Sequence, residues 1–157
     1  MHRMEVLHPL SHQHHDGLMA VLLLKKGIEK QASPAVMRDF ILQLWEPGLR
    51  RHFLAEELHL QPDQLQAPGT AALYTRMKEE HAAIRSLILS LKEGAADMES
   101  IRSFADMLEK HIRFEEREFF EALQNEAPAL QLEELGKQLN SLETIKSCET
   151  YPVRFWE

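Results

Sequence analysis

Two six-residue segments decide the fold of this chain, HFLAEE at residues 52–57 and HIRFEE at residues 111–116. Both read H-x-x-x-E-E, and the apolar residues around each recur at helical spacing. Residues four apart on a helix lie one above the other on the same face. Each segment therefore predicts a helix that points one imidazole and one carboxylate at the same place.

The residues that punctuate the sequence predict an all-α chain. Ser33 and Pro34 indicate a helix start, Pro128 requires a helix to end, and Gly94 is expected to close a helix in a left-handed conformation. No segment has the alternation of a strand between turn signals. The expected helices cover residues 11–30, 34–61, 70–93 and 98–126, followed by a shorter amphipathic helix within 132–142.

Three local features refine this prediction. Ser11 is a candidate N-cap for the first helix. Pro47 lies inside the second helix, where its missing N–H predicts a kink one turn before His52. The apolar tail at residues 151–157 is expected either to fold back onto the helices or to form an interface.

A second pair of histidines occurs on the other two long helices. His15 and His81 are each followed three residues later by an apolar residue, so the chain repeats one histidine and then one H-x-x-x-E segment. In an antiparallel up-down four-helix bundle, this repeat brings six side chains to one level of the core. The candidate metal ligands are His15, His52, Glu56, His81, His111 and Glu115.

Two alternatives stay open around these ligands. In the run HQHH at residues 12–15, helical phase against the leucines three and seven positions further on favours His15, and His14 remains the alternative. Glu57 and Glu116 are expected either as exposed partners of arginines or as acceptors of a hydrogen bond from a ligand imidazole.

The residue types in this group favour metal binding. A carboxylate that faces a bundle core without a partner would cost several kcal/mol on desolvation, and a metal ion removes that cost. Four imidazoles and two carboxylates are enough for two ions. Bridging carboxylates with an open coordination position suit iron or manganese, whereas structural zinc prefers closed tetrahedral Cys/His sites. The predicted cofactor is a pair of iron ions, with Mn or Zn as substitutes.

Composition excludes several other classes. The net charge of −7, from 25 acidic and 18 basic residues, argues against a nucleic-acid partner. No apolar run approaches the roughly 20 residues that span a bilayer, so no membrane association is expected. A single cysteine, Cys148, and a start without the apolar core of a secretory signal predict a cytoplasmic protein.

With these motifs the chain resembles the hemerythrin-like (HHE cation-binding) domain family, over about residues 7–128. The resemblance implies one domain over residues 1–157, with the bundle at about 7–128 and a C-terminal helix and tail at 129–157. It also implies an oxo- or hydroxo-bridged non-haem di-iron centre, with the four histidines as terminal ligands and Glu56 and Glu115 as bridges.

The chain differs from the oxygen carriers of that family. Those proteins have a further histidine where this chain has Met77, and an aspartate at a different spacing in the last ligand helix. The set of four histidines and two glutamates is more similar to hemerythrin-like iron sensors and to bacterial di-iron proteins that repair iron–sulfur clusters.

The leading hypothesis is a di-iron protein that binds or senses O₂, NO or iron, in a response to oxidative or nitrosative stress. One alternative is a di-iron oxidase, peroxidase or NO-handling enzyme. Another is a metal-free helical interaction module that docks a partner through Phe155 and Trp156. A homodimer formed through the C-terminal segment is a further expectation.

Overall fold

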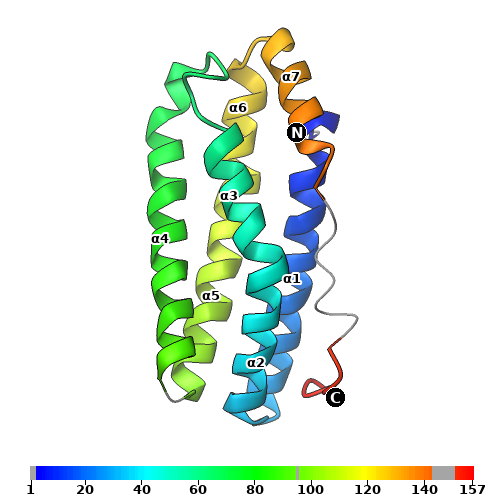
Figure 1. The fold of residues 1–157 in the computed structure, drawn as a ribbon, viewed down its shortest axis with the longest axis vertical. Helices are drawn as coiled ribbons and strands as arrows, with labels where there is room; N and C mark the ends of the chain where they lie inside the picture. Colours follow the sequence, from blue (N-terminus) through cyan, green and yellow to red (C-terminus); the bar gives the residue numbers. More distant parts are fainter. Residues whose placement is uncertain (1–2, 95, 143–150) are drawn as a thin grey trace.

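The computed structural model describes residues 3–94, 96–142 and 151–157. Four helical columns run side by side along the long axis: α1, α2 continued by α3, α4, and α5 continued by α6 (Figure 1). Their bounds, with the shorter elements, are η1 Glu5–Leu7, α1 His8–Glu29, α2 Pro34–Leu44, η2 Trp45–Leu49, α3 Arg50–His59, η3 Pro68–Thr70, α4 Ala71–Glu93, α5 Met98–Phe114, η4 Glu115–Phe119, α6 Phe120–Glu126 and α7 Ala129–Leu139. The described ranges contain no strand, and the predicted all-α bundle with an additional C-terminal helix is confirmed.

The helix ends confirm one predicted cap and correct two. The Ser33 side chain accepts a hydrogen bond from the backbone N–H of Val36 at the start of α2, as expected. Ser11 is not a cap, because α1 begins at His8 with a proline in its first turn. Gly94 closes α4 with a φ of −106° and a ψ of 178°, so its backbone is extended and not left-handed.

Two of the columns are interrupted by a π-helical turn. The turn at η2 contains Pro47, which has no N–H to give to the helical ladder, and the predicted irregularity before His52 is confirmed in this form. The turn at η4 begins at Glu115 and contains neither proline nor glycine, so no residue within it indicates the irregularity. Both turns adjoin an H-x-x-x-E segment.

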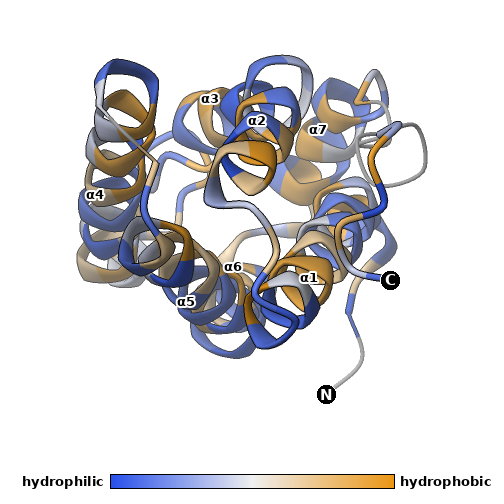
Figure 2. Cartoon of the chain, turned by 90° about the horizontal axis from the view of Figure 1, so that it is seen from below, coloured by the Kyte–Doolittle hydropathy of each residue, from blue (hydrophilic) through white to orange (hydrophobic). Residues whose placement is uncertain are grey.

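The apolar core has two parts, one on each side of the middle of the bundle. One part lies toward the end of the bundle where α1 connects to α2 and α4 connects to α5, and it includes Phe40 and Phe104. The other gathers the opposite ends together with α7 and includes Phe119 and Leu135. Seen along the bundle, the apolar residues gather on the inward faces of the helices (Figure 2). Polar side chains buried between these two parts therefore have little access to bulk water.

Helix α1 packs on α5 through small residues. Gly17 and Ala20 are buried on this face, and a Cβ atom built on Gly17 would lie 2.9 Å from Ile112 Cδ1. Leu22, which we expected on the inner face, is 46% exposed. The leucines of α1 occur on more than one face, and the face with Gly17, which makes room for the Ile112 side chain, is the one that packs on α5.

The C-terminal residues pack on the bundle. Helix α7 buries Leu132, Leu135 and Leu139. The Tyr151 hydroxyl donates a 3.0 Å hydrogen bond to the backbone oxygen of Val36. Phe155 packs edge-on against Phe40, so the tail folds back, one of the two expected outcomes. Cys148 lies outside the described residues. Within the described ranges, no helix has both the length and the apolar composition needed to cross a membrane.

Candidate metal centre

Six titratable side chains converge between the two parts of the core. Each is at most 3% exposed, and together they form two groups that share both carboxylates. Within each group the potential ligand atoms all lie within 4.8 Å of one another. The first group is His14, His52, Glu56 and Glu115, and the second is Glu56, His81, His111 and Glu115.

Five of the six predicted ligands lie in these groups, and one prediction is corrected. His15, the predicted ligand, is exposed on the outer side of α1. His14 is buried and lies where the prediction places His15. The physical reason is the packing of α1 through Gly17 and Ala20, which turns His14 toward the core. The leucines that we used to set the helical phase do not define this face.

The first group has short contacts between its inward-facing atoms. His14 Nε2 lies 3.2 Å from Glu115 Oε1, and His52 Nε2 lies 3.1 Å from Glu56 Oε2. The two Nε2 atoms are 3.0 Å apart. One helical turn therefore supplies His52 and Glu56 together, as the spacing predicted.

The second group repeats this arrangement. His81 Nε2 lies 3.1 Å from Glu56 Oε1, and His111 Nε2 lies 2.8 Å from Glu115 Oε1. The Nε2 atoms of the two histidines are 3.1 Å apart. Glu56 thus offers one oxygen to each group, which is the arrangement of a carboxylate that bridges two ions.

Each of the four imidazoles directs its other nitrogen, Nδ1, to an oxygen acceptor outside the group. All four acceptors are carboxylate or amide oxygens, so each Nδ1 carries the proton and donates it. The donors and acceptors are His14 to Glu116 at 2.8 Å, His52 to Gln13 at 2.6 Å, His81 to Glu57 at 2.6 Å and His111 to Glu80 at 2.8 Å.

This protonation pattern tests whether the side chains fit a metal. A neutral imidazole with its proton on Nδ1 presents the lone pair of Nε2 inward, and pairs of these atoms face each other at about 3 Å. Such neighbours need either a second proton or a cation between them. Glu56 Oε2 and Glu115 Oε2 are also buried with no hydrogen-bond partner. The donor set of imidazole nitrogens and carboxylate oxygens therefore fits two metal ions.

Arginines form ion pairs with the outer carboxylates. Arg85 lies 2.8 Å from Glu57, and Arg76 lies 2.9 Å from Glu80. Arg3 and Ser11 both approach Glu116. Both roles that we considered for the glutamate after each motif, arginine partner and acceptor from an imidazole, are therefore present together.

Sequence reasoning missed two members of this outer layer, Gln13 and Glu80. Each immediately precedes a histidine of the centre, His14 or His81. However, each accepts from a histidine on a different helix, His52 or His111. Adjacency in the sequence could have pointed to the two residues, but it could not have paired them.

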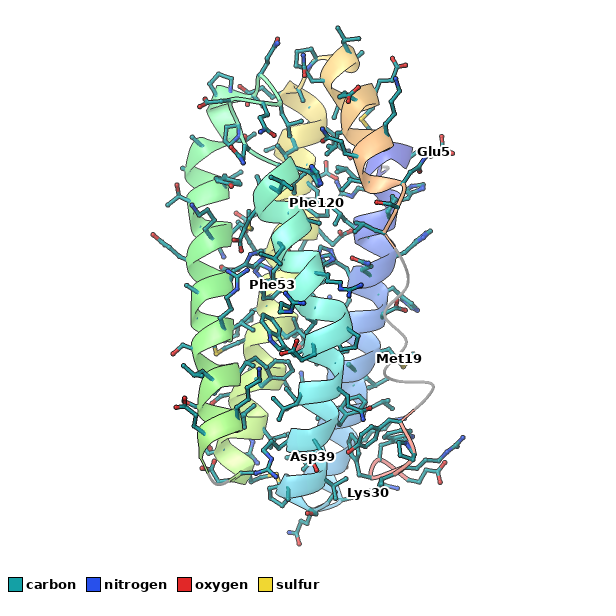
Figure 3. All side chains as sticks on the ribbon, viewed as in Figure 1. Glu5, Met19, Lys30, Asp39, Phe53 and Phe120 are labelled. Carbon is teal, nitrogen blue, oxygen red and sulfur yellow. The ribbon has the colours of Figure 1, made fainter. Side chains whose placement is uncertain are left out.

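Aromatic rings hold two of the imidazoles. Phe53 stacks on His81 with ring centroids 3.8 Å apart and an angle of 6° between the planes. Phe120 stacks on His14 at 5.3 Å. Figure 3 shows Phe53 about halfway along the bundle and Phe120 closer to the end that carries α7. The rings restrict rotation of the imidazoles and exclude water from the centre.

The electrostatics of the group favour charged forms in the absence of metal. Burial lowers the pKa of His111, but the charge of Glu115 and the hydrogen bonds to Glu115 and Glu80 outweigh it and raise the pKa to about 10. Burial opposes ionisation of Glu56, but the positive charge of His52 keeps the pKa of that carboxyl well below its usual range. Either protons on the histidines or metal ions can thus satisfy the same buried charges.

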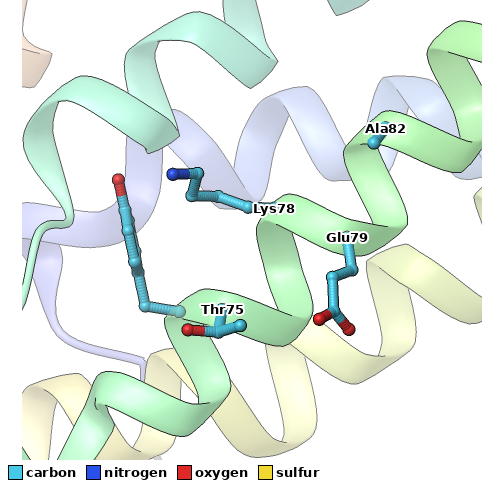
Figure 4. Close-up of a pocket in the computed structure, with 5 residues that line it drawn as sticks. Thr75, Lys78, Glu79 and Ala82 are labelled. Carbon is cyan, nitrogen blue, oxygen red and sulfur yellow. The ribbon is translucent and has the colours of Figure 1, made fainter.

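A cavity of about 190 Å³ lies between α4 and α5, beside His111 of the centre. Its lining includes Glu80, Ile84, Lys110 and His111. A second depression, of about 290 Å³, lies along α4 and is lined by Lys78, Glu79 and their neighbours (Figure 4). No residue of the centre lines this second depression, whereas His111 lines the first.

Comparison with known proteins supports the site as a whole. The family model described as Hemerythrin HHE cation binding domain matches residues 8–123. The match covers all six converging side chains. Neither the curated protein sequences nor the solved structures contain a match to the chain.

Proposed function

Because the chain belongs to the hemerythrin HHE cation-binding family, we propose that it is a non-haem di-iron protein that binds or senses O₂, NO or iron. The match to a cation-binding family and the two buried His/Glu groups fit a site for two metal ions. Iron and the small ligand are the parts that we propose.

The observation that carries this proposal is the sharing of Glu56 and Glu115 between the two groups. Two carboxylates common to both positions would hold two ions close together, with two imidazoles completing each side. Imidazole and carboxylate ligands of this kind leave coordination positions open for a small molecule. Open positions suit iron, whereas a structural zinc site is closed. Bound iron would supply the redox chemistry and the affinity for O₂ or NO.

The chain's own residues would bind and orient the ions and limit what reaches them. The outer acceptors fix the Nδ1 protons, so every Nε2 lone pair is available to a metal. Phe53 and Phe120 keep bulk water away from the imidazoles. The cavity beside His111 has room for a diatomic molecule or a small anion, and its size disfavours a bulky organic substrate.

The metal-free interaction module fits these observations poorly. Glu56 and Glu115 are fully buried, and each has an oxygen without a hydrogen-bond partner. Taking charged groups out of water costs free energy even when they are paired, and replacing a buried charged cluster with apolar residues is often neutral or stabilising, so a protein without a metal function has little reason to retain this one.

Elemental analysis of protein produced with iron would test the proposal, together with absorption spectra before and after air, azide and NO. We expect close to two irons per chain and a ferric absorption that changes with azide or NO. Absence of bound iron would contradict the di-iron assignment. Sustained turnover of peroxide or NO would instead favour the enzyme alternative.

A further inference from the structure

Each group consists of two histidines and the two shared glutamates, but the acceptors of the Nδ1 protons differ between the groups. His81 and His111 both donate to carboxylates, Glu57 at 2.6 Å and Glu80 at 2.8 Å. In the other group, His52 donates to the neutral amide oxygen of Gln13 at 2.6 Å. Gln13 is 6% exposed, so it is part of the buried site and not of the surface.

An outer carboxylate changes what an imidazole offers to a metal. A carboxylate draws the Nδ1 proton more strongly than an amide oxygen does, because the hydrogen bond is assisted by its negative charge. The imidazole then becomes a more basic donor at Nε2. The negative charge also attracts the cation directly, an effect that an amide lacks.

The arginines reduce the charge of the outer carboxylates but leave the carboxylate oxygens as the acceptors of the Nδ1 protons. Glu57 and Glu80 each pair with one arginine, at 2.8 and 2.9 Å. Glu116, the acceptor for His14, likewise lies near Arg3, at 3.7 Å. All three outer carboxylates have a basic partner. Among the four outer acceptors, Gln13 alone offers an amide oxygen, so its hydrogen bond with His52 lacks the assistance of a carboxylate charge.

We infer that the two metal positions are unequal, with the His81/His111 position binding a divalent ion more tightly and Gln13 weakening the His14/His52 position. The inference rests on the proposed function and adds to it a mode of regulation. As the supply of iron falls, the His14/His52 position empties first, while the other position keeps its ion. Gln13 is in this sense a positioning residue that acts through His52.

Anaerobic titration of the metal-free protein with Co²⁺ would test this inference, since the visible absorption of the bound ion reports each step. We expect two steps of different affinity. Gln13→Glu should strengthen the weaker step by about tenfold or more and bring the two steps together, because outer partners typically change metal affinity by about 10- to 100-fold. A gain in affinity cannot result from misfolding.

Two variants of the other group should act in the opposite direction. Glu57→Gln and Glu80→Gln should each weaken the tighter step by about tenfold or more. Glu79→Gln is the matched control, because Glu79 precedes Glu80 but is exposed, beside the depression on the outer side of α4. It should leave both steps unchanged.

The outcomes separate this inference from the proposed function. Two equal steps in the parent protein would overturn the inference and leave two-metal binding intact. So would a Gln13→Glu variant with an unchanged weaker step, or Glu57→Gln and Glu80→Gln variants that affect only the weaker step. Absence of any Co²⁺ binding would instead contradict two-metal binding itself.

Discussion

Raising the pH should destabilise the metal-free protein. Folding raises the pKa of His111 from 6.5 to about 10, so between these values the folded chain holds a proton that the unfolded chain has released. The stabilisation is therefore complete below pH 6.5 and is lost as the pH rises toward 10. At about 1.4 kcal/mol for each pKa unit, this difference corresponds to about 5 kcal/mol from His111 alone.

His81 contributes with the same sign, and Glu56 with the opposite sign at acid pH. Burial lowers the pKa of His81, but the hydrogen bonds to Glu56 and Glu57 outweigh it, and the pKa of His81 is raised on folding. The depressed pKa of Glu56 acts only in acid, where its stabilisation is lost as the pH falls. Above neutral pH, the change of the free energy of unfolding with pH thus comes from the histidines.

Urea unfolding of chelator-treated protein at several pH values between about 6 and 10 would measure this dependence. We expect the free energy of unfolding to fall by several kcal/mol across this range. The fall should be smaller in His111→Gln, which has no imidazole to titrate. Metal-loaded protein should not show the fall, because a metal takes the place of the protons. A free energy that stays constant or rises in the metal-free parent would refute the reasoning.

Three further predictions concern the site and the helix packing that supports it. Glu56→Ala combined with Glu115→Ala should abolish two-metal binding, since both positions share these carboxylates, and an unchanged metal content by elemental analysis would contradict the assignment. His14→Ala should lower the metal content, whereas His15→Ala should not; the opposite result would restore our original choice of ligand. Gly17→Leu should lower the free energy of unfolding by about 1–3 kcal/mol through overpacking against α5, and denaturant unfolding that shows no loss would contradict the close approach.

Much of the architecture could be predicted because the H-x-x-x-E-E segments are unambiguous. Their spacing fixes which side chains share a helix face, and this depends only on helix geometry. His52, Glu56, His111 and Glu115 all lie where that geometry put them. The helix boundaries near proline were also predictable, because proline acts on the backbone locally.

The orientation of α1 was not predictable from its own residues. Leucines at 22, 23 and 24 cover more than one side of that helix, so hydrophobicity alone does not define a face. The buried side is decided by how closely α1 can approach α5, and Gly17 permits that approach. Long-range contacts of this kind also pair Gln13 with His52, which no local pattern encodes.

The π-helical turn at η2 has a consequence for how related sequences should align with this one. A π-helical turn holds one more residue than the α-helical turn it replaces, so the helix on either side keeps the orientation it would have without that residue. A relative that lacks Pro47 could therefore run as one uninterrupted helix from α2 into α3 and still present its counterparts of His52 and Glu56 to the centre. The resulting alignment would have a one-residue gap in the middle of a helix, where gaps are ordinarily taken as errors.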